Sequence, residues 1–159
     1  MEKNILIIDS DISLKKVLLK ALSNSKTIIH SVSSISEAWV KISKNFYDLV
    51  ITDVKLPDGD GLELVEKLTE KRTNTKIIII SAKNNLLTAI KANELDVFEY
   101  MPKPIDLNDL TIIVSRALQK KNKTSEVYID EEKLPIIGQK FIKQTLHSSL
   151  AGGITPVMS

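Results

Sequence analysis

Short aliphatic runs alternate with amphipathic segments along the first 118 residues, and this alternation restricts the possible folds more than any other feature. Five runs have the character of buried strands, and they span residues 5–8, 27–32, 48–53, 76–81 and 97–101. Between these runs, apolar residues recur at three- and four-residue steps, as in helices that bury one face. Strict alternation of strands and helices is typical of a parallel sheet with helices on both faces.

Five helices are expected from this periodicity, and they start near residues 12, 34, 62, 86 and 106. Ser34 or Ser36 can cap the second helix, and Asp106 opens the fifth. Right-handed crossovers leave few topologies for five strand–helix units. The sequence therefore predicts an α/β fold, a doubly wound five-stranded parallel sheet, followed by a C-terminal helical extension.

Composition excludes several classes of function. The chain has no cysteine, which rules out disulfides, thiolate zinc sites and a cysteine nucleophile. A net charge of +2, without a basic stripe, gives no sign of direct nucleic-acid binding. The longest aliphatic runs, such as Ile77 to Ile80, are too short to span a membrane, so a cytoplasmic location is expected.

Polar residues gather where the strands end. In a doubly wound sheet, ligands bind outside the carboxyl ends of the strands. Three acids, a hydroxyl and an ammonium are expected to converge there, from Asp9, Asp11, Asp53, Ser81 and Lys103.

This set of side chains suits phosphoryl chemistry. Crowded carboxylates repel one another, and Mg²⁺ between them relieves the repulsion while leaving positions for phosphate oxygens. A lysine and a serine can hold those oxygens, and a carboxylate can attack phosphorus to form an acyl phosphate. Taken singly, Asp9 or Asp11 can instead cap the first helix, and Asp53 can simply end its strand.

Over about residues 3–120, the sequence resembles the receiver domain of bacterial two-component response regulators. Five motifs carry the resemblance in order and spacing, and they run from Ile5 to Asp9, Asp48 to Asp53, Leu56 to Leu62, Ile77 to Ala82 and Tyr100 to Pro104. The resemblance implies a flavodoxin-like fold and a phosphoacceptor domain that receives its phosphoryl group from a sensor histidine kinase. Such a domain is a signalling module rather than a turnover enzyme.

The resemblance also implies roles for individual residues. Asp53 would be the phosphoacceptor, and Asp9, Asp53 and the backbone carbonyl of Lys55 would bind Mg²⁺. The family usually has a second acid directly after the first, and here that position is Ser10, with Asp11 next along. Either Ser10 or Asp11 is therefore a further candidate ligand, and the missing carboxylate is expected to weaken Mg²⁺ binding.

Other family features concern the switch. Ser81 and Lys103 would hold the phosphoryl group, next to a Lys103–Pro104 bond expected to be cis. Ser81 and Tyr100 would be the switch residues, and rotation of the Tyr100 side chain would report phosphorylation. Asp96 stands where the family usually has glycine, and aspartate tolerates the left-handed conformation that this turn needs.

The C-terminal part resembles a different domain. Residues 1–121 are assigned to the receiver and 122–133 to a linker. Residues 134–159 resemble the start of the AAA+ ATPase domain of nitrogen-regulatory response regulators, and partial disorder is expected there. No G-x-x-x-x-G-K-[ST] motif or helix-turn-helix follows. The expectation is therefore a transcription-regulatory lineage truncated before its ATPase core.

Two other functions remain open at this point. Asp9-Ser10-Asp11 fits the D-x-D of haloacid-dehalogenase-type phosphatases, in which Asp9 would be the nucleophile. Ser10 also allows a pseudo-receiver that folds and interacts without phosphorylation.

A phosphorylation-dependent homodimer is a further possibility. The fifth predicted helix has apolar residues at the spacing of a short coiled-coil seam, namely Leu107, Leu110, Val114 and Ala117. The same spacing also suits a helix that packs on the sheet.

Overall fold

The computed structural model describes residues 2–71, 74–82 and 86–119. Within these ranges, five parallel strands form one sheet in the order β2-β1-β3-β6-β7. This order confirms the predicted doubly wound sheet. The strands are β1 (Lys3–Ile8), β2 (Thr27–Val32), β3 (Leu49–Asp53), β6 (Lys76–Ser81) and β7 (Glu99–Pro102).

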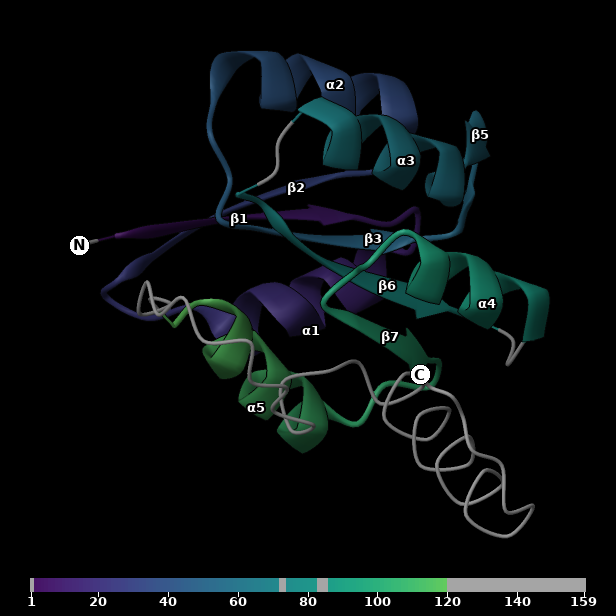
Figure 1. Ribbon diagram of the computed structural model, residues 1–159. Coiled ribbons are helices and arrows are strands. Elements are labelled where there is room, and N and C mark those ends of the chain that lie inside the picture. Colours follow the sequence, from purple (N-terminus) through teal and green to yellow (C-terminus); the bar gives the residue numbers. More distant parts are fainter. Residues whose placement is uncertain (1, 72–73, 83–85, 120–159) are drawn as a thin grey trace, which may run out of the picture.

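The helices of the described ranges cover both faces of this sheet (Figure 1). One face carries α1 (Ile12–Leu22) and α5 (Leu107–Ala117). The other face carries α2 (Ile35–Lys44), α3 (Gly61–Lys71) and α4 (Leu86–Glu94).

Two apolar cores result, because neighbouring residues of a strand point to opposite sides of the sheet. On β3, Val50 packs in the core beneath α2 and α3, whereas Ile51 packs in the core beneath α1 and α5. From Ile77 to Ile80, β6 is buried on both faces, as its uninterrupted aliphatic sequence predicts.

Side-chain caps fix where several helices begin. Asp11, Ser34 and Asp106 are the N-caps of α1, α2 and α5, and each accepts a hydrogen bond from a backbone N–H of the first turn. Of the alternatives that the sequence left open, Asp11 rather than Asp9 caps the first helix, and Ser34 rather than Ser36 caps the second.

The segment between β3 and α3 contains a small hairpin that the sequence pattern did not predict. Its antiparallel strands, β4 (Lys55–Leu56) and β5 (Gly59–Asp60), are joined by Pro57 and Asp58. Each strand has only two residues, too few for periodicity to reveal. The hairpin connects the end of β3 directly to the start of α3.

Two smaller expectations are met, and one alternative that the sequence left open is decided. Asp96 has a φ of 57°, and the Lys103–Pro104 bond is cis. On α5, Leu110 and Val114 are buried against the sheet, so this spacing serves packing within the chain. Leu107, the first residue of the spacing, is exposed.

Some predictions concern residues that the structure does not describe. The linker at 122–133, the effector start at 134–159 and the helical extension all lie outside the described residues. Among the residues that are described, no helix has the length and apolar character needed to cross a membrane.

Candidate functional site

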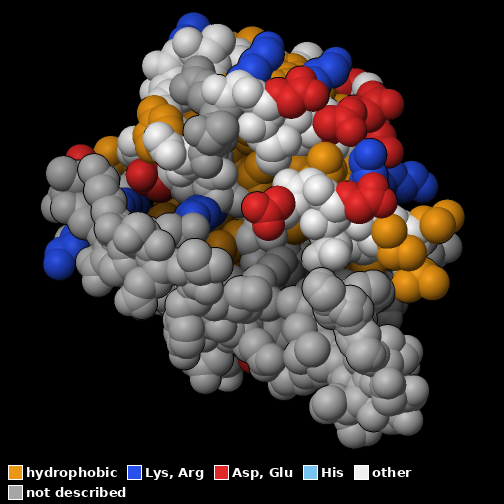
Figure 2. All heavy atoms as spheres, viewed as in Figure 1, with side chains coloured by type: hydrophobic (Ala, Val, Ile, Leu, Met, Phe, Trp, Pro, Cys, Tyr) orange, Lys and Arg blue, Asp and Glu red, His pale blue; other side chains and the backbone are white. Residues whose placement is uncertain are grey.

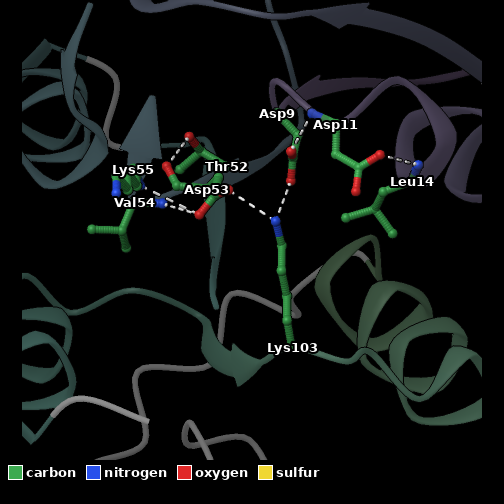
Figure 3. A network of polar contacts seen from close by, with 8 residues as sticks. All are labelled: Asp9, Asp11, Leu14, Thr52, Asp53, Val54, Lys55 and Lys103. Atoms are coloured by element: carbon green, nitrogen blue, oxygen red, sulfur yellow. Dashed lines mark hydrogen bonds and ion pairs between the residues drawn. The ribbon is translucent and has the colours of Figure 1, made fainter. Parts of the chain in front are cut away.

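The carboxyl edge of the sheet brings together three of the side chains that the sequence placed there (Figure 3). Asp9 directly follows β1, Asp53 ends β3, and Lys103 directly follows β7. Because β1 and β3 are hydrogen-bonded neighbours, the two carboxylates extend from adjacent strands.

The Lys103 ammonium bridges these carboxylates. Its Nζ lies 3.0 Å from Oδ2 of Asp9 and donates to Oδ2 of Asp53 at 2.9 Å. The side chains of Asp9 and Asp53 are only 2% and 8% exposed, whereas that of Lys103 is 20% exposed. Two carboxylates against one ammonium leave a net negative charge in a largely desolvated site, which a further cation would neutralise.

The remaining oxygen of Asp53 is held by the backbone. Its Oδ1 accepts hydrogen bonds from the backbone N–H groups of Val54 at 2.7 Å and Lys55 at 3.3 Å. The carboxylate is therefore oriented from both sides, by main-chain donors on one oxygen and by Lys103 on the other.

Asp9 retains an acceptor position. Its Oδ1 accepts from the backbone N–H of Asp11 at 2.8 Å. Its Oδ2 is buried and has the Lys103 ion pair but no partner with hydrogen-bond geometry. A buried carboxylate oxygen with spare acceptor capacity is a ligand position for a hard cation.

The donor set fits Mg²⁺. In residues 2–71, 74–82 and 86–119, no group of three or more His, Cys, Asp or Glu side chains is arranged to hold a metal ion. Asp9 and Asp53 are a pair of carboxylates that meet at the Lys103 ammonium. Mg²⁺ is commonly bound through one or two carboxylates and keeps several waters. Two converging carboxylates with a residual negative charge meet this requirement.

Lys103 remains charged at neutral pH. Burial lowers the pKa of its amine, but the hydrogen bond to Asp53 and the negative charges of Asp9 and Asp53 outweigh that effect and raise the pKa above its ordinary value of 10.5. The stability that this pairing contributes is therefore present below the pKa of the unfolded chain and is lost as pH rises through the higher folded pKa.

Gly61 sets how closely α3 approaches the phosphoacceptor candidate. A Cβ atom at this position would lie 2.1 Å from the backbone oxygen of Asp53. The Gly61 N–H also donates to the backbone oxygen of Val54 at 2.6 Å. The motif from Leu56 to Leu62 contains Gly61, but its sequence alone did not predict this close approach, although a glycine eight residues after Asp53 was a visible signal.

The two residues after Asp9 do not add a second acid to the pair. Asp11 directs its Oδ1 to the backbone N–H of Leu14, at 3.0 Å, and points along α1 rather than toward Lys103 (Figure 3). Ser10 is exposed. Asp11 therefore serves as a helix cap in this structure.

Ser81 lies on β6 and Tyr100 lies on β7, the strand next to it. Ser81 is buried at the end of β6, and its backbone oxygen accepts from the backbone N–H of Lys103 at 2.7 Å. Tyr100 is buried on β7 in the core shared with α2, α3 and α4. Their roles in holding phosphate and in switching remain predictions.

Comparison with known proteins decides the family. The model of the response regulator receiver domain matches residues 5–115 of this chain. The chain belongs to the receiver domain family. Receiver domains are signalling modules of two-component systems, which receive phosphoryl groups from sensor histidine kinases and generally need Mg²⁺ for this reaction. The phosphatase and pseudo-receiver alternatives are not favoured by this match.

The relatives include a DNA-binding transcriptional regulator and a response regulator protein. This receiver is 36% identical over 151 residues to the DNA-binding transcriptional regulator NtrC of Azospirillum brasilense, covering 92% of this chain and 31% of that protein. It is 33% identical over 121 residues to the response regulator PilR of Pseudomonas aeruginosa, covering 76% of this chain and 27% of that protein. The chain thus spans about a third of the length of these curated relatives.

A solved structure agrees with the fold. A two-component response regulator from Clostridium difficile superposes with a TM-score of 0.71 at 30% sequence identity, covering 77% of this chain and all of that one.

Replacing Lys103 with methionine in this receiver is expected to destabilise it by about 2 kcal/mol without divalent ions. The two buried carboxylates would lose their counter-charge, although the partial exposure of Lys103 keeps the cost below that of a fully buried pair. Urea unfolding in the presence of a chelator measures the loss. Lys91→Met is the matched control, since Lys91 pairs with Glu66 on the surface at 3.2 Å and should change stability by less than about 1 kcal/mol. Equal losses of stability in the Lys103 and Lys91 variants would show that Lys103 is not the counter-charge that the buried carboxylates need.

Proposed function

We propose that this receiver accepts a phosphoryl group on Asp53 from the phosphohistidine of a sensor kinase. The observation that carries the proposal is the placement of the Asp53 carboxylate beside Asp9, within 2.9 Å of the Lys103 ammonium, at the carboxyl edge of the sheet. Such a site offers a nucleophile, a fixed positive charge and a residual negative charge for a divalent ion.

The residues divide the work of phosphoryl transfer. An oxygen of Asp53 forms a bond to phosphorus while the bond from phosphorus to the donor imidazole nitrogen breaks, and the imidazole leaves with the electron pair. Lys103 lies close enough to shift from Asp53 to an oxygen of the transferred group, because its ammonium is on a flexible stem. The Ser81 hydroxyl donates to another oxygen of the transferred phosphoryl group. The Tyr100 side chain rotates in response to this new hydrogen bond.

Asp9, Asp53 and the backbone carbonyl of Lys55 would hold Mg²⁺. The ion, when bound, supplies positive charge to the phosphoryl oxygens during transfer. Asp9 contributes through its incompletely hydrogen-bonded Oδ2. Ser10 contributes through its hydroxyl or through water, in place of a carboxylate.

Incubation with acetyl phosphate and Mg²⁺, followed by intact-mass spectrometry, tests this function. The expected result is a single added phosphoryl group whose formation stops when Mg²⁺ is chelated. Absence of labelling at millimolar Mg²⁺ would contradict the proposal and return the pseudo-receiver to consideration.

Ser10→Asp is expected to tighten Mg²⁺ binding about tenfold or more. A carboxylate about 4 Å from a divalent ion adds roughly 2 kcal/mol of attraction even at the dielectric constant of water. Isothermal calorimetry with MgCl₂ measures the difference. Ser13→Asp is the control, because it adds the same charge at an exposed position of α1. Equal Mg²⁺ affinities for the two variants would show that position 10 does not contribute to the metal site.

The remaining parts of the proposal concern the residues after the receiver, the output and self-association. The alignment with NtrC covers 92% of this chain, which supports assigning residues 134–159 to the start of an AAA+ effector domain after a linker. The similarity to a DNA-binding transcriptional regulator supports transcription regulation as the output. Phosphorylation is expected to promote homodimer formation, which light scattering with and without beryllofluoride tests.

A further inference from the structure

A carboxylate outside the phosphoacceptor pocket ties the hairpin after Asp53 to a helix on the sheet. Asp58 lies at the hairpin turn and accepts hydrogen bonds from two backbone N–H groups of α2. Its Oδ1 accepts from Ile35 at 2.8 Å, and its Oδ2 accepts from Ser36 at 3.0 Å. These donors lie in the first turn of α2, where backbone N–H groups have no partner within the helix.

The hairpin and the helix also touch through carbon atoms. A Cβ added to Gly59 would lie 3.0 Å from Cδ1 of Ile35, so the backbone of the hairpin runs against this side chain. Gly59 has a φ of 155°, which a larger residue rarely adopts. Leu56, on the other strand of the hairpin, is buried in the core beneath α2 and α3. The tip of the hairpin is therefore fixed from outside its own segment.

The base of the hairpin leads to the site. Lys55 pairs with Asp60 in the hairpin register, and its backbone N–H donates to Asp53. Only the two turn residues, Pro57 and Asp58, separate the two strands, so Asp58 and Lys55 belong to one short hairpin. Figure 1 shows β5 at the same end of the molecule as the first turn of α2 and the carboxyl ends of the strands.

The surface around these elements is strongly charged. Figure 2 shows acidic and basic side chains gathered side by side on the face of the molecule that is turned to the viewer. Asp58 is also exposed to solvent, but two backbone N–H groups of α2 engage both oxygens of its carboxylate and fix its orientation.

We propose that Asp58 is a positioning residue for the divalent ion. By capping α2 from a distant segment, it holds the hairpin so that the Lys55 carbonyl stays at the metal pocket. This inference rests on the proposed function, in which that carbonyl is a ligand. Residues that orient metal ligands from outside the coordination sphere commonly change metal affinity when they are replaced.

The hydrogen bonds to Asp58 are already formed in its charged state. The backbone N–H groups of Ile35 and Ser36 lower the pKa of this carboxyl below its ordinary value of 3.8. The link therefore persists at any pH at which the phosphoacceptor would work.

The test compares two caps of the same helix. Asp58→Ala removes the cap that comes from the hairpin, whereas Ser34→Ala removes the cap at the helix's own N-terminus, where Ser34 accepts from Glu37 at 3.2 Å. Both variants weaken α2, but only the first releases the hairpin. Mg²⁺ titration by calorimetry is the readout, and circular dichroism establishes that each variant is folded at the temperature used.

Asp58→Ala is expected to lower Mg²⁺ affinity about tenfold, and Ser34→Ala is expected to leave it within about twofold of the wild type. Asp58→Asn retains one acceptor oxygen, is the safer variant for folding, and should give an intermediate affinity. Unchanged affinity in both Asp58 variants, or an equal loss in Ser34→Ala, would overturn the proposal. Failure of the proposed function itself would be recognised separately, because the wild type would then neither bind Mg²⁺ nor accept phosphate.

Discussion

Replacing Asp53 with asparagine is expected to reduce phosphoryl labelling to below detection. An amide at this position cannot form the acyl phosphate, since the nucleophilic oxygen has lost its negative charge. The fold should persist, because the amide keeps the shape of the carboxylate it replaces and Lys103 retains its ion pair with Asp9. Intact-mass spectrometry after incubation with acetyl phosphate and Mg²⁺ measures the loss.

The choice of control makes this result specific to the phosphoacceptor. Asp11→Asn removes a carboxylate from the same edge of the sheet, but from a side chain that caps α1. It should label normally, with a stability loss of about 1 kcal/mol at most. If Asp53→Asn were labelled instead, the nucleophile would be a different aspartate, and Asp9→Asn would then be the variant to examine.

Replacing Gly61 with alanine is expected to produce the largest loss of stability among the site variants, about 3 kcal/mol. The added methyl group would stand 2.1 Å from the backbone oxygen of Asp53, and backbone cannot move aside as a flexible side chain can. Either α3 or the end of β3 must shift. Asp53 would therefore be displaced as well, and labelling should slow even in molecules that remain folded.

Urea unfolding and the initial rate of labelling by acetyl phosphate separate these two effects. Glu63→Ala is a suitable control, since Glu63 lies in the same first turn of α3 but is exposed, and its removal should cost less than about 1 kcal/mol. A Gly61→Ala protein as stable as the wild type would show that α3 does not need this close approach.

Sequence periodicity was sufficient for the main architecture, because the central strands of the sheet are buried on both faces. The run from Ile77 to Ile80 has no polar interruption, and its prediction as a buried strand is confirmed. The alternation of strands and helices also predicts that Asp9, Asp53 and Lys103 lie at one edge of the sheet, because the carboxyl ends of parallel strands all lie on the same side. Their convergence in the structure depends on strand order, which the alternation only narrowed to a few topologies.

Features that depend on contacts between distant segments were not predictable. Asp58 and Ile35 are 23 residues apart, and nothing in the local pattern indicates that one caps the helix of the other. Asp9 and Asp11 are equally good capping residues by type, and only the backbone course after β1 decides between them. Exposed charged residues carry little periodic signal, so their partners become known only with the fold.

Strand β7 stands at the border of the sheet and pairs with β6 alone. Tyr100 and Met101 follow one another on it and enter the two separate apolar cores. If β7 and the adjoining Lys103 moved, only the hydrogen bonds between β7 and β6 would have to break. The same movement would change the packing of both apolar cores. We therefore expect the proposed phosphorylation of Asp53, at the carboxyl edge of the sheet, to alter the packing on both faces.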